Sequence, residues 1–243
     1  MSATTRTAEG LARLLAALIL SGCATTSEVR DPIEPFNRAM FSFNEYADRY
    51  FMRPGAIAYS AVTPKPIQQG VGNFFRNLRT VDSAVASFLQ GKAKKGAVEV
   101  GRMVINTTFG IGGLIDVARK VGLEAQHEDM GQTFAVWAWE NPPYLVLPLL
   151  GPSNLRDGPD HALQQIFLPP LILPFYNPAL RAIDGLQQRT EQMDATDARD
   201  DMALDKYVFT REAFMQRRRF LVYDGDPPAE DFDDLLDELD EAQ

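Results

Sequence analysis

Apolar residues recur at helical spacing along most of this chain, in segments that proline and glycine keep short. They fall at every third or fourth position between residues 36 and 51, and similar stripes follow in residues 67–78, 81–89 and 93–105. A period near 3.6 residues is typical of amphipathic helices, whereas strands alternate with a period of two. Neither a series of strands nor a repeated strand–helix unit is apparent. The fold is therefore predicted to be mainly α-helical.

Proline and glycine predict where several of these helices end. Arg53, Pro54 and Gly55 are expected to end the first helix, and a rigid turn is expected at residues 63–66 (TPKP). Gly91 is expected to end the third stripe. Further helices are predicted at residues 114–121, from residue 178 to about 193, and at about 204–221.

A glycine-rich break lies between the fourth stripe and the next short helix. Gly110, Gly112 and Gly113 predict a structural turn in which one backbone segment approaches another. Further along, residues 133–139 alternate imperfectly and fit either a strand or a helix. Their spacing does not decide between the two.

Beyond residue 22, no apolar stretch reaches the roughly 18–20 residues that a membrane-spanning helix requires. The longest runs, residues 144–150 and 167–176, are interrupted by prolines. Such short runs can lie in one membrane leaflet or pack as a protein core. Periodicity alone favours neither, and the same holds for the aromatic residues Trp137, Trp139 and Tyr144.

The N-terminal residues indicate export. Basic residues precede an apolar run at residues 14–20, and small residues follow, as in a secretory signal peptide. Residues 20–23 (LSGC) resemble a bacterial lipobox, and Cys23 is the only cysteine in the chain. We therefore predict a cleaved signal peptide at 1–22, with the cut between Gly22 and Cys23, and a lipidated tether at 23–30.

The predicted anchor consists of a diacylglycerol and an N-acyl chain on Cys23. Two or more acyl chains hold a protein stably at a membrane, whereas one chain binds only marginally. The residue after the cysteine is Ala24 rather than the aspartate that retains many lipoproteins in the inner membrane. This favours a lipid-anchored location on the periplasmic side of the outer membrane of a Gram-negative bacterium.

Charge divides the remaining chain into two parts. The formal net charge is −9, and residues 224–243 contain many acidic residues and no basic one. This segment is predicted to be a disordered acidic tail, and residues 31–223, whose net charge is close to neutral, to be one helical domain. Without a basic patch, nucleic acid is not an expected partner.

The common enzymatic motifs are missing. His127 and His161 are the two histidines, and they lack the spacing of a zinc site. No Gly-x-Ser-x-Gly elbow occurs, and the glycine-rich break lacks the third glycine of a dinucleotide fingerprint. We therefore predict neither a catalytic residue, nor a metal site, nor a cofactor, and we do not expect an enzyme.

Longer motifs resemble the MlaA (VacJ) family of outer-membrane lipoproteins, in order and with family-like spacing over about residues 31–222. The motifs stand at residues 31–38 (DPIEPFNR), 41–44 (FSFN), 71–78 (VGNFFRNL), 105–116 (INTTFGIGGLID), 129–134 (DMGQTF), 143–157 (PYLVLPLLGPSNLRD) and 211–217 (REAFMQR).

The resemblance implies a ring of amphipathic and interfacial helices that lies in the inner leaflet of the outer membrane around a polar channel. Such proteins remove mislocalised phospholipids from the outer leaflet and pass them to a periplasmic, MlaC-like lipid carrier, which maintains lipid asymmetry. They commonly associate with trimeric porins, and phospholipid is the transported substrate. A charged headgroup is costly to move through hydrocarbon, and a polar channel lowers that cost.

The resemblance also implies candidate residues for the polar path or for a conformational gate at residues 40–46. These candidates are Asn37, Arg38, Met40, Phe43, Asn44, Asn73 and Asn77. It further assigns an apolar set to a membrane belt or to the core, without separating the two. That set comprises Phe36, Phe41, Phe43, Phe74, Phe75, Leu145, Leu147, Leu149 and residues 171–173.

Two other functions stay open on the sequence. The first is a structural adaptor lipoprotein that binds porins without transporting lipid. The second is an envelope hydrolase that acts on lipid, which the missing nucleophile and metal motifs disfavour.

Overall fold

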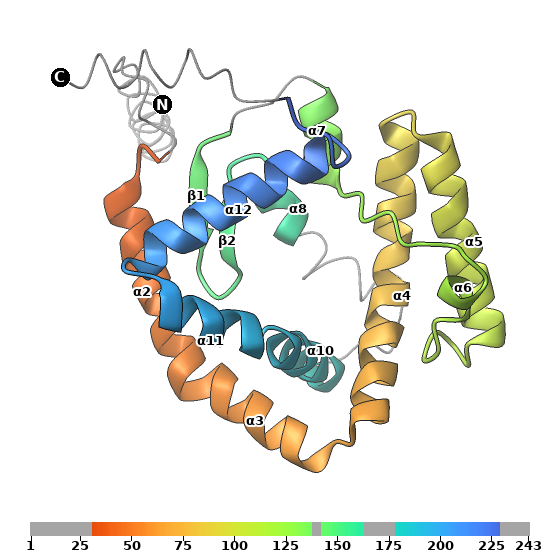
Figure 1. Ribbon diagram of the computed structural model, residues 1–243, viewed down its shortest axis with the longest axis horizontal. Helices are drawn as coiled ribbons and strands as arrows, with labels where there is room; N and C mark the ends of the chain where they lie inside the picture. Colours follow the sequence, from red (N-terminus) through yellow and green to blue (C-terminus); the bar gives the residue numbers. More distant parts are fainter. Residues whose placement is uncertain (1–30, 138–141, 163–177, 229–243) are drawn as a thin grey trace, which may run out of the picture. The chain divides into compact units, whose positions relative to one another are not determined.

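The computed structural model describes residues 31–137, 142–162 and 178–228. The signal peptide, Gly22, Cys23, Trp139, residues 171–173 and most of the acidic tail lie outside these ranges. All the elements named below belong to one unit, Ile33–Pro228. This unit is mainly helical, as the sequence predicts (Figure 1).

The first helical run continues well past its expected end. Helix α2 (Glu34–Ala47), the π-helix η1 (Asp48–Met52) and α3 (Arg53–Val62) follow one another directly. The predicted end at residues 53–55 is wrong because Pro54 falls in the first turn of α3, where a missing N–H is tolerated. Gly55 permits close packing instead, since a Cβ there would lie 2.8 Å from Leu186.

Helices α4 (Lys65–Leu89) and α5 (Ala93–Phe109) pack side by side (Figure 1). The stripes at 67–78 and 81–89 belong to the single helix α4, because no proline or glycine separates them. The turn predicted at residues 63–66 is confined to Thr63, which is extended, and Pro64, because α4 already begins at Lys65 with Pro66 in its first turn. Gly91, with φ +76°, lies in the tight turn between the two helices.

Short elements follow α5. Helix α6 (Val117–Lys120) is shorter than the helix expected at 114–121, because the Asp116 carboxylate accepts a hydrogen bond from the Arg119 N–H and starts the helix there. Helix α7 (Met130–Val136) begins after Asp129, which accepts from the Gln132 N–H in the same way. The described part of residues 133–139 is therefore helical up to Val136.

A β-hairpin, which the sequence did not indicate, lies between α7 and α8 (Gly158–Ala162). Strand β1 (Tyr144–Leu147) pairs antiparallel with β2 (Gly151–Asn154), Tyr144 opposite Asn154 and Leu147 opposite Gly151. In the connecting loop Leu149 has φ +62°, which is unusual for a branched residue.

Three helices complete the unit: α10 (Pro178–Glu191), α11 (Met193–Met202) and α12 (Lys206–Val222). Asp205 caps α12 by accepting hydrogen bonds from the N–H groups of Tyr207 and Val208. Within the described ranges, none of the helices combines the length and the hydropathy that crossing a membrane requires.

Packing contacts between these elements close a circuit. Helix α2 continues through η1 into α3, which packs on α10, and α10 packs on α4. Helix α4 contacts α7, α7 contacts α12, α12 contacts β2, and the hairpin returns to α2. Figure 1 shows the same succession of elements around the unit.

The buried apolar cluster is small and lies where α2, the hairpin and α12 meet. Tyr144, Val146 and Tyr207 form its centre, and Phe41 packs against it with its ring 5.7 Å from that of Tyr207. Its other partly buried members are Met40, Val208, Phe214 and Met215.

Candidate functional site

Polar and apolar side chains are distributed unusually in the described part of the chain. Buried polar and charged residues outnumber buried hydrophobic ones, whereas many large apolar side chains are exposed, among them Phe51 (70%) and Phe109 (71%). A protein in water buries apolar groups and leaves most charged groups outside. Extensive exposed apolar surface marks contact with a membrane or a partner. The buried polar groups and the apolar exterior are therefore the candidate functional features of this protein.

Two asparagines of α2 hold the hairpin. Asn37, fully buried, donates from Nδ2 to the Tyr144 carbonyl (3.0 Å) and accepts at Oδ1 from the Val146 N–H (2.9 Å). Asn44, two turns along the helix, donates to the Leu147 carbonyl (2.9 Å) and accepts from the Leu149 N–H (2.7 Å). Each amide pairs with β1 or its loop as a neighbouring strand would. This pairing also holds Leu149 in its left-handed conformation.

A buried network of charges joins α7, the hairpin and α12. Arg218 donates from Nη2 to Asp129 Oδ1 (2.9 Å), and its Nε lies 2.7 Å from Asp157 Oδ2. On the other side, Arg156 Nε lies 2.7 Å from Asp157 Oδ1, and Asn154 Nδ2 donates to Oδ2. We call these five residues the ion network. A Cβ on Gly131 would lie 2.2 Å from Asp157 Oδ1, so that glycine is required beside it.

The pairing in the ion network changes the acidity of its members. Burial alone would raise the pKa of Asp129, but hydrogen bonds and charge from Arg218, with the N–H of Gln132, lower it below its ordinary value. Burial alone would lower the pKa of Arg218, and the two carboxylates instead raise it above its ordinary value. Both groups are therefore ionised at neutral pH.

The glycine-rich break packs against α4 and α5. Gly112 and Gly113 have φ of +67° and +97°, and Gly110 leaves no room for a Cβ, which would lie 2.1 Å from the Ile115 carbonyl oxygen. Asn77 donates to the Thr107 hydroxyl (3.0 Å), and Asn73 donates to the Leu114 carbonyl (3.0 Å). The two asparagines thus lie against this turn.

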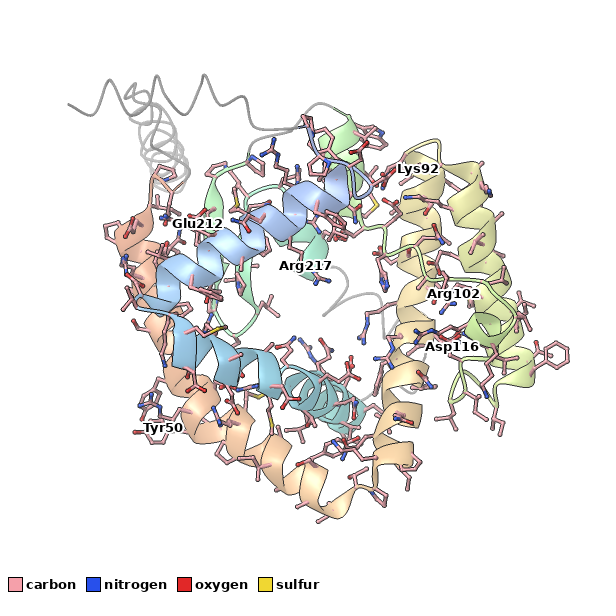
Figure 2. All side chains as sticks on the ribbon, in the orientation of Figure 1. Tyr50, Lys92, Arg102, Asp116, Glu212 and Arg217 are labelled. Carbon is pink, nitrogen blue, oxygen red and sulfur yellow. The ribbon has the colours of Figure 1, made fainter. Side chains whose placement is uncertain are left out.

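Asn106 and Asp116 fix the far side of the same turn. Asn106 donates to Asp116 Oδ1 (3.0 Å) and accepts from the Ala118 N–H (2.8 Å). Arg102 Nη2 donates to Asp116 Oδ2 (3.1 Å), and its Nη1 donates to the Leu123 carbonyl. Figure 2 shows Arg102 and Asp116 between α5 and α6.

The remaining predicted gate and path residues lie on different sides of α2. Met40 packs against the apolar cluster. Phe43 is 47% exposed. Arg38 pairs with Glu34 (2.6 Å) and Asp205 (2.9 Å), and its guanidinium lies 4.5 Å from the centre of the Tyr207 ring. Asn37 and Asn44 contact the hairpin together, while Asn73 and Asn77 lie by the glycine turn.

The apolar set assigned to belt or core is divided between the two. Phe36 and Leu149 are exposed like Phe43, whereas Phe75 is 3% exposed. The remaining members of this set that the structure describes are partly buried, and they are Phe41, Phe74, Leu145 and Leu147.

Two cavities adjoin the predicted gate segment. The first, of about 220 Å³, lies where η1 meets α10 and α11, and ion pairs line it. Among them, Arg189 Nη2 lies 2.8 Å from Asp48 Oδ2, and Arg199 Nη1 lies 3.0 Å from Glu45 Oε1. Its lining residues are Glu45, Asp48, Arg49, Arg53, Arg189, Thr196, Arg199 and Asp200.

The second cavity, of about 340 Å³, lies along α2 and η1 beside the start of α12 and combines aromatic with charged side chains. It shares Glu45 and Arg49 with the first. We call it the aromatic cavity. Its lining residues are Phe41, Ser42, Glu45, Tyr46, Arg49, Tyr50 and Lys206.

The ion network and both cavities were not predicted from the sequence. Residues 129–134 and 143–157 are family motifs without a predicted role, although they supply Asp129, Asn154, Arg156 and Asp157. Arg218 lies in the helix predicted at about 204–221, but no role was predicted for it. A signal was available, because a charged residue inside a family motif is a candidate for a buried pair.

The described residues contain no cluster of histidine, cysteine, aspartate and glutamate that could hold a metal ion. His127 is exposed, with φ +55°. The charged groups of the ion network are paired with one another rather than directed at an open site.

Comparisons with known proteins agree on one family. The family described as MlaA lipoprotein matches residues 29–221. The intermembrane phospholipid transport system lipoprotein MlaA of Escherichia coli K12 is 32% identical over 243 residues, which cover 93% of this chain and 96% of that protein. The lipoprotein of the same name from Haemophilus influenzae is 31% identical, with 95% and 98% covered.

Two further similarities extend the comparison. An uncharacterized protein of Rickettsia typhi is 37% identical over 201 residues, which cover 82% of this chain and 79% of that protein. A chain solved in work on the structural basis for maintenance of bacterial outer membrane lipid asymmetry superposes with a TM-score of 0.68 at 33% identity. That match covers 79% of this chain and 98% of the solved one.

Proposed function

Because the chain belongs to the MlaA lipoprotein family, we propose that it is an outer-membrane lipoprotein that removes mislocalised phospholipids from the outer leaflet. It passes them through a polar channel to a periplasmic lipid carrier and so maintains lipid asymmetry. Relatives named as components of an intermembrane phospholipid transport system support the general role. The family is one of transport-system lipoproteins rather than a known enzyme family, and we propose that no covalent chemistry is involved.

The observation that carries this proposal is the inverted polarity of the described residues. Charged and amide side chains are buried while large apolar side chains are exposed. An unpaired charge in hydrocarbon costs several kcal/mol or more, so a lipid headgroup crosses a leaflet more easily beside polar groups. An exterior rich in Phe, Val, Ile and Leu keeps such a protein among acyl chains. A body closed by a circuit of contacts is suited to enclose such a polar path.

Anchoring and partners complete the proposal. Acyl chains on Cys23 hold the protein in the inner leaflet of the outer membrane. The exposed apolar side chains contact that leaflet and a trimeric porin, and a soluble, MlaC-like carrier receives the lipid. Asn37, Arg38, Met40, Phe43, Asn44, Asn73 and Asn77 remain candidates for the polar path or its gate.

The test is the amount of outer-leaflet phospholipid in cells that lack the gene, measured by labelling at the cell surface. We expect a rise on deletion, which the wild-type chain reverses. The Cys23→Ala chain should not reverse it, because the unlipidated protein is not held at the membrane. Porin abundance is measured in the same strains.

The same experiment distinguishes transport from the adaptor alternative. An adaptor that only binds porins predicts unchanged outer-leaflet phospholipid on deletion while porins remain intact. That result would overturn the transport proposal. Release of lysophospholipid or free fatty acid by the purified protein would instead revive a hydrolase.

A further inference from the structure

A row of exposed aromatic side chains runs along one face of the α2–η1 segment. Phe36, Phe43, Tyr46 and Tyr50 follow at intervals of seven, three and four residues, which places them on the same side of the helix. Tyr46 and Tyr50 are 61% and 57% exposed, and their ring centres lie 4.5 Å apart. Figure 2 shows Tyr50 projecting outward from this segment. We call these four residues the aromatic row.

The aromatic row ends at the aromatic cavity, since Tyr46 and Tyr50 also line it. Three charged residues share that lining. Glu45 is neutralised by Arg199, with Nη1 3.0 Å from Oε1, and Lys206 Nζ lies 2.8 Å from Asp200 Oδ2. Arg49 is exposed and forms no ion pair with any described residue. Among the described residues, one positive charge of the cavity lining is therefore left without an ion-pair partner.

We propose that the aromatic cavity binds the phosphate of one glycerophospholipid through Arg49. An acyl chain then lies along the aromatic row, and Lys206, which also pairs with Asp200, is a further donor to the phosphate. The inference rests on the proposed function, because it names where that function's lipid first contacts the protein.

The chemistry of the lining favours a phosphodiester over other ligands. A guanidinium offers paired N–H donors whose geometry matches two phosphate oxygens, and it is more weakly hydrated than an ammonium. Tyrosines that are apolar at the ring and polar at the hydroxyl suit the boundary between headgroup and acyl chain. Neither a free anion nor a hydrocarbon alone uses both parts of this lining.

The dimensions and the backbone agree with a binding site. The cavity volume of about 340 Å³ lies within the range of about 300–1,000 Å³ that is usual for small-molecule sites. Arg49 and Tyr50 belong to the π-helix η1, where the Arg53 N–H bonds to the Asp48 carbonyl five residues back. Short π-helical segments occur frequently at functional sites. This widened turn sets Arg49 between the two cavities.

Lipid binding to the purified, lipidated full-length protein in detergent tests the proposal. Dioleoyl phosphatidylglycerol is titrated and the bound lipid is counted by native mass spectrometry. We expect the apparent Kd of the Arg49→Gln variant to rise about tenfold, and that of Arg49→Lys to rise less. Lys94→Gln is the matched control, because Lys94 is an exposed lysine on α5 without an ion pair among the described residues. Its Kd should not change.

Two further probes separate the parts of the ligand. Dioleoylglycerol, which has the same acyl chains without a phosphate, should bind equally to the wild-type and Arg49→Gln proteins. Inorganic phosphate at millimolar concentration should not displace phosphatidylglycerol. Displacement by inorganic phosphate that depends on Arg49 would overturn the assignment to a lipid in favour of a free-phosphate site.

Equal affinity of the wild-type and Arg49→Gln proteins for phosphatidylglycerol would overturn the binding site. That result leaves the proposed function standing if gene deletion still raises outer-leaflet phospholipid. Failure of the deletion experiment would overturn the function, whatever binds at Arg49. The two measurements therefore fail independently.

Discussion

Two clusters of arginines and carboxylates in this protein differ in how completely their charges are paired. In the ion network the side chains of Arg156 and Asp157 are each 2% exposed, and Arg218 lies between two carboxylates. Around η1 the carboxylate partners are about 30% exposed, two cavities adjoin the charges, and Arg49 has no ion pair among the described residues. Complete pairing fixes the positions of structural elements. Incomplete pairing leaves a charge for a ligand.

The largest effect is expected from Arg218→Met, which leaves Asp129, whose side chain is only 19% exposed, without its counter-charge. Removing one partner of a buried ion pair costs about 3–5 kcal/mol, and we expect a loss of that size in the free energy of unfolding. Denaturant unfolding in detergent measures it. The neighbouring Arg217, exposed and labelled in Figure 2, provides the control: Arg217→Met should change stability by less than about 0.5 kcal/mol.

A double variant tests whether the loss arises from the unpaired carboxylate. Asp129→Asn removes the carboxylate charge that Arg218→Met leaves unpaired. The double variant should therefore lose less free energy of unfolding than the sum of the two separate losses. Strict additivity would show that Arg218 contributes through packing rather than through its charge.

Acid should weaken the ion network next. The pKa of Asp129 is lower in the folded protein than in the unfolded chain. Its pairing therefore contributes fully above the unfolded pKa of about 4 and is lost as the pH falls through the folded value. Hydrogen bonds to charged groups are worth about 1.5–3 kcal/mol, and a fall of that order below pH 4 is expected. Unfolding measured from about pH 6 to pH 2.5 should show it.

The Asp129→Asn variant provides the comparison for this acid loss. Its stability should depend less steeply on pH, because the titrating group is gone. Some dependence should remain, since other carboxylates also have lowered pKa values. The backbone N–H groups of Arg119 and Val208, and then Arg102 and Arg38, lower the pKa values of Asp116 and Asp205, and Lys92 and Lys95 lower that of Asp224. Identical pH profiles for the variant and the wild type would contradict the assigned role.

Much of the fold follows from local patterns. Helices α4 and α5 are predicted by the spacing of apolar residues, and the turn at Pro64 is visible in the sequence itself, although many of those apolar residues are exposed and the two helices bury mainly polar ones. The continuation of the first helical run through Pro54 could not be predicted from the sequence, because it depends on a π turn and on the packing of Gly55 against Leu186. Tertiary contacts here override a local stop signal.

The site was less accessible to sequence reasoning because its partners lie far apart in the chain. Asn37 meets Tyr144 across 107 positions, and Arg218 meets Asp129 across 89. The hairpin itself was missed because Pro148 and the short apolar run read as an interrupted segment. A family resemblance can indicate that these residues are important, but only the structure identifies the residues with which they interact.

A smaller loss of stability is expected when the hydrogen bonds between α2 and the hairpin are removed. Asn37→Ala leaves the buried Tyr144 carbonyl and Val146 N–H without this partner, and unsatisfied buried groups cost about 1–3 kcal/mol. Asn44→Ala, at a half-buried position, should cost about 1 kcal/mol or less. Denaturant unfolding of the two variants measures the two losses in the free energy of unfolding, which can then be compared. An Asn44→Ala loss equal to or larger than that of Asn37→Ala would contradict the burial argument.

The smallest effect on stability is expected from Arg49→Gln. This small change would contrast most sharply with the large loss expected from Arg218→Met. Arg49 is exposed and forms no ion pair with any described residue, so its removal leaves no buried charge behind. We expect a change within about 0.5 kcal/mol in unfolding without added lipid. A ligand that binds only the folded state stabilises it in proportion to its affinity, so added phosphatidylglycerol should stabilise the wild type more than the variant. A large loss without lipid would show that Arg49 supports the fold, and the contrast between the two arginines would then disappear.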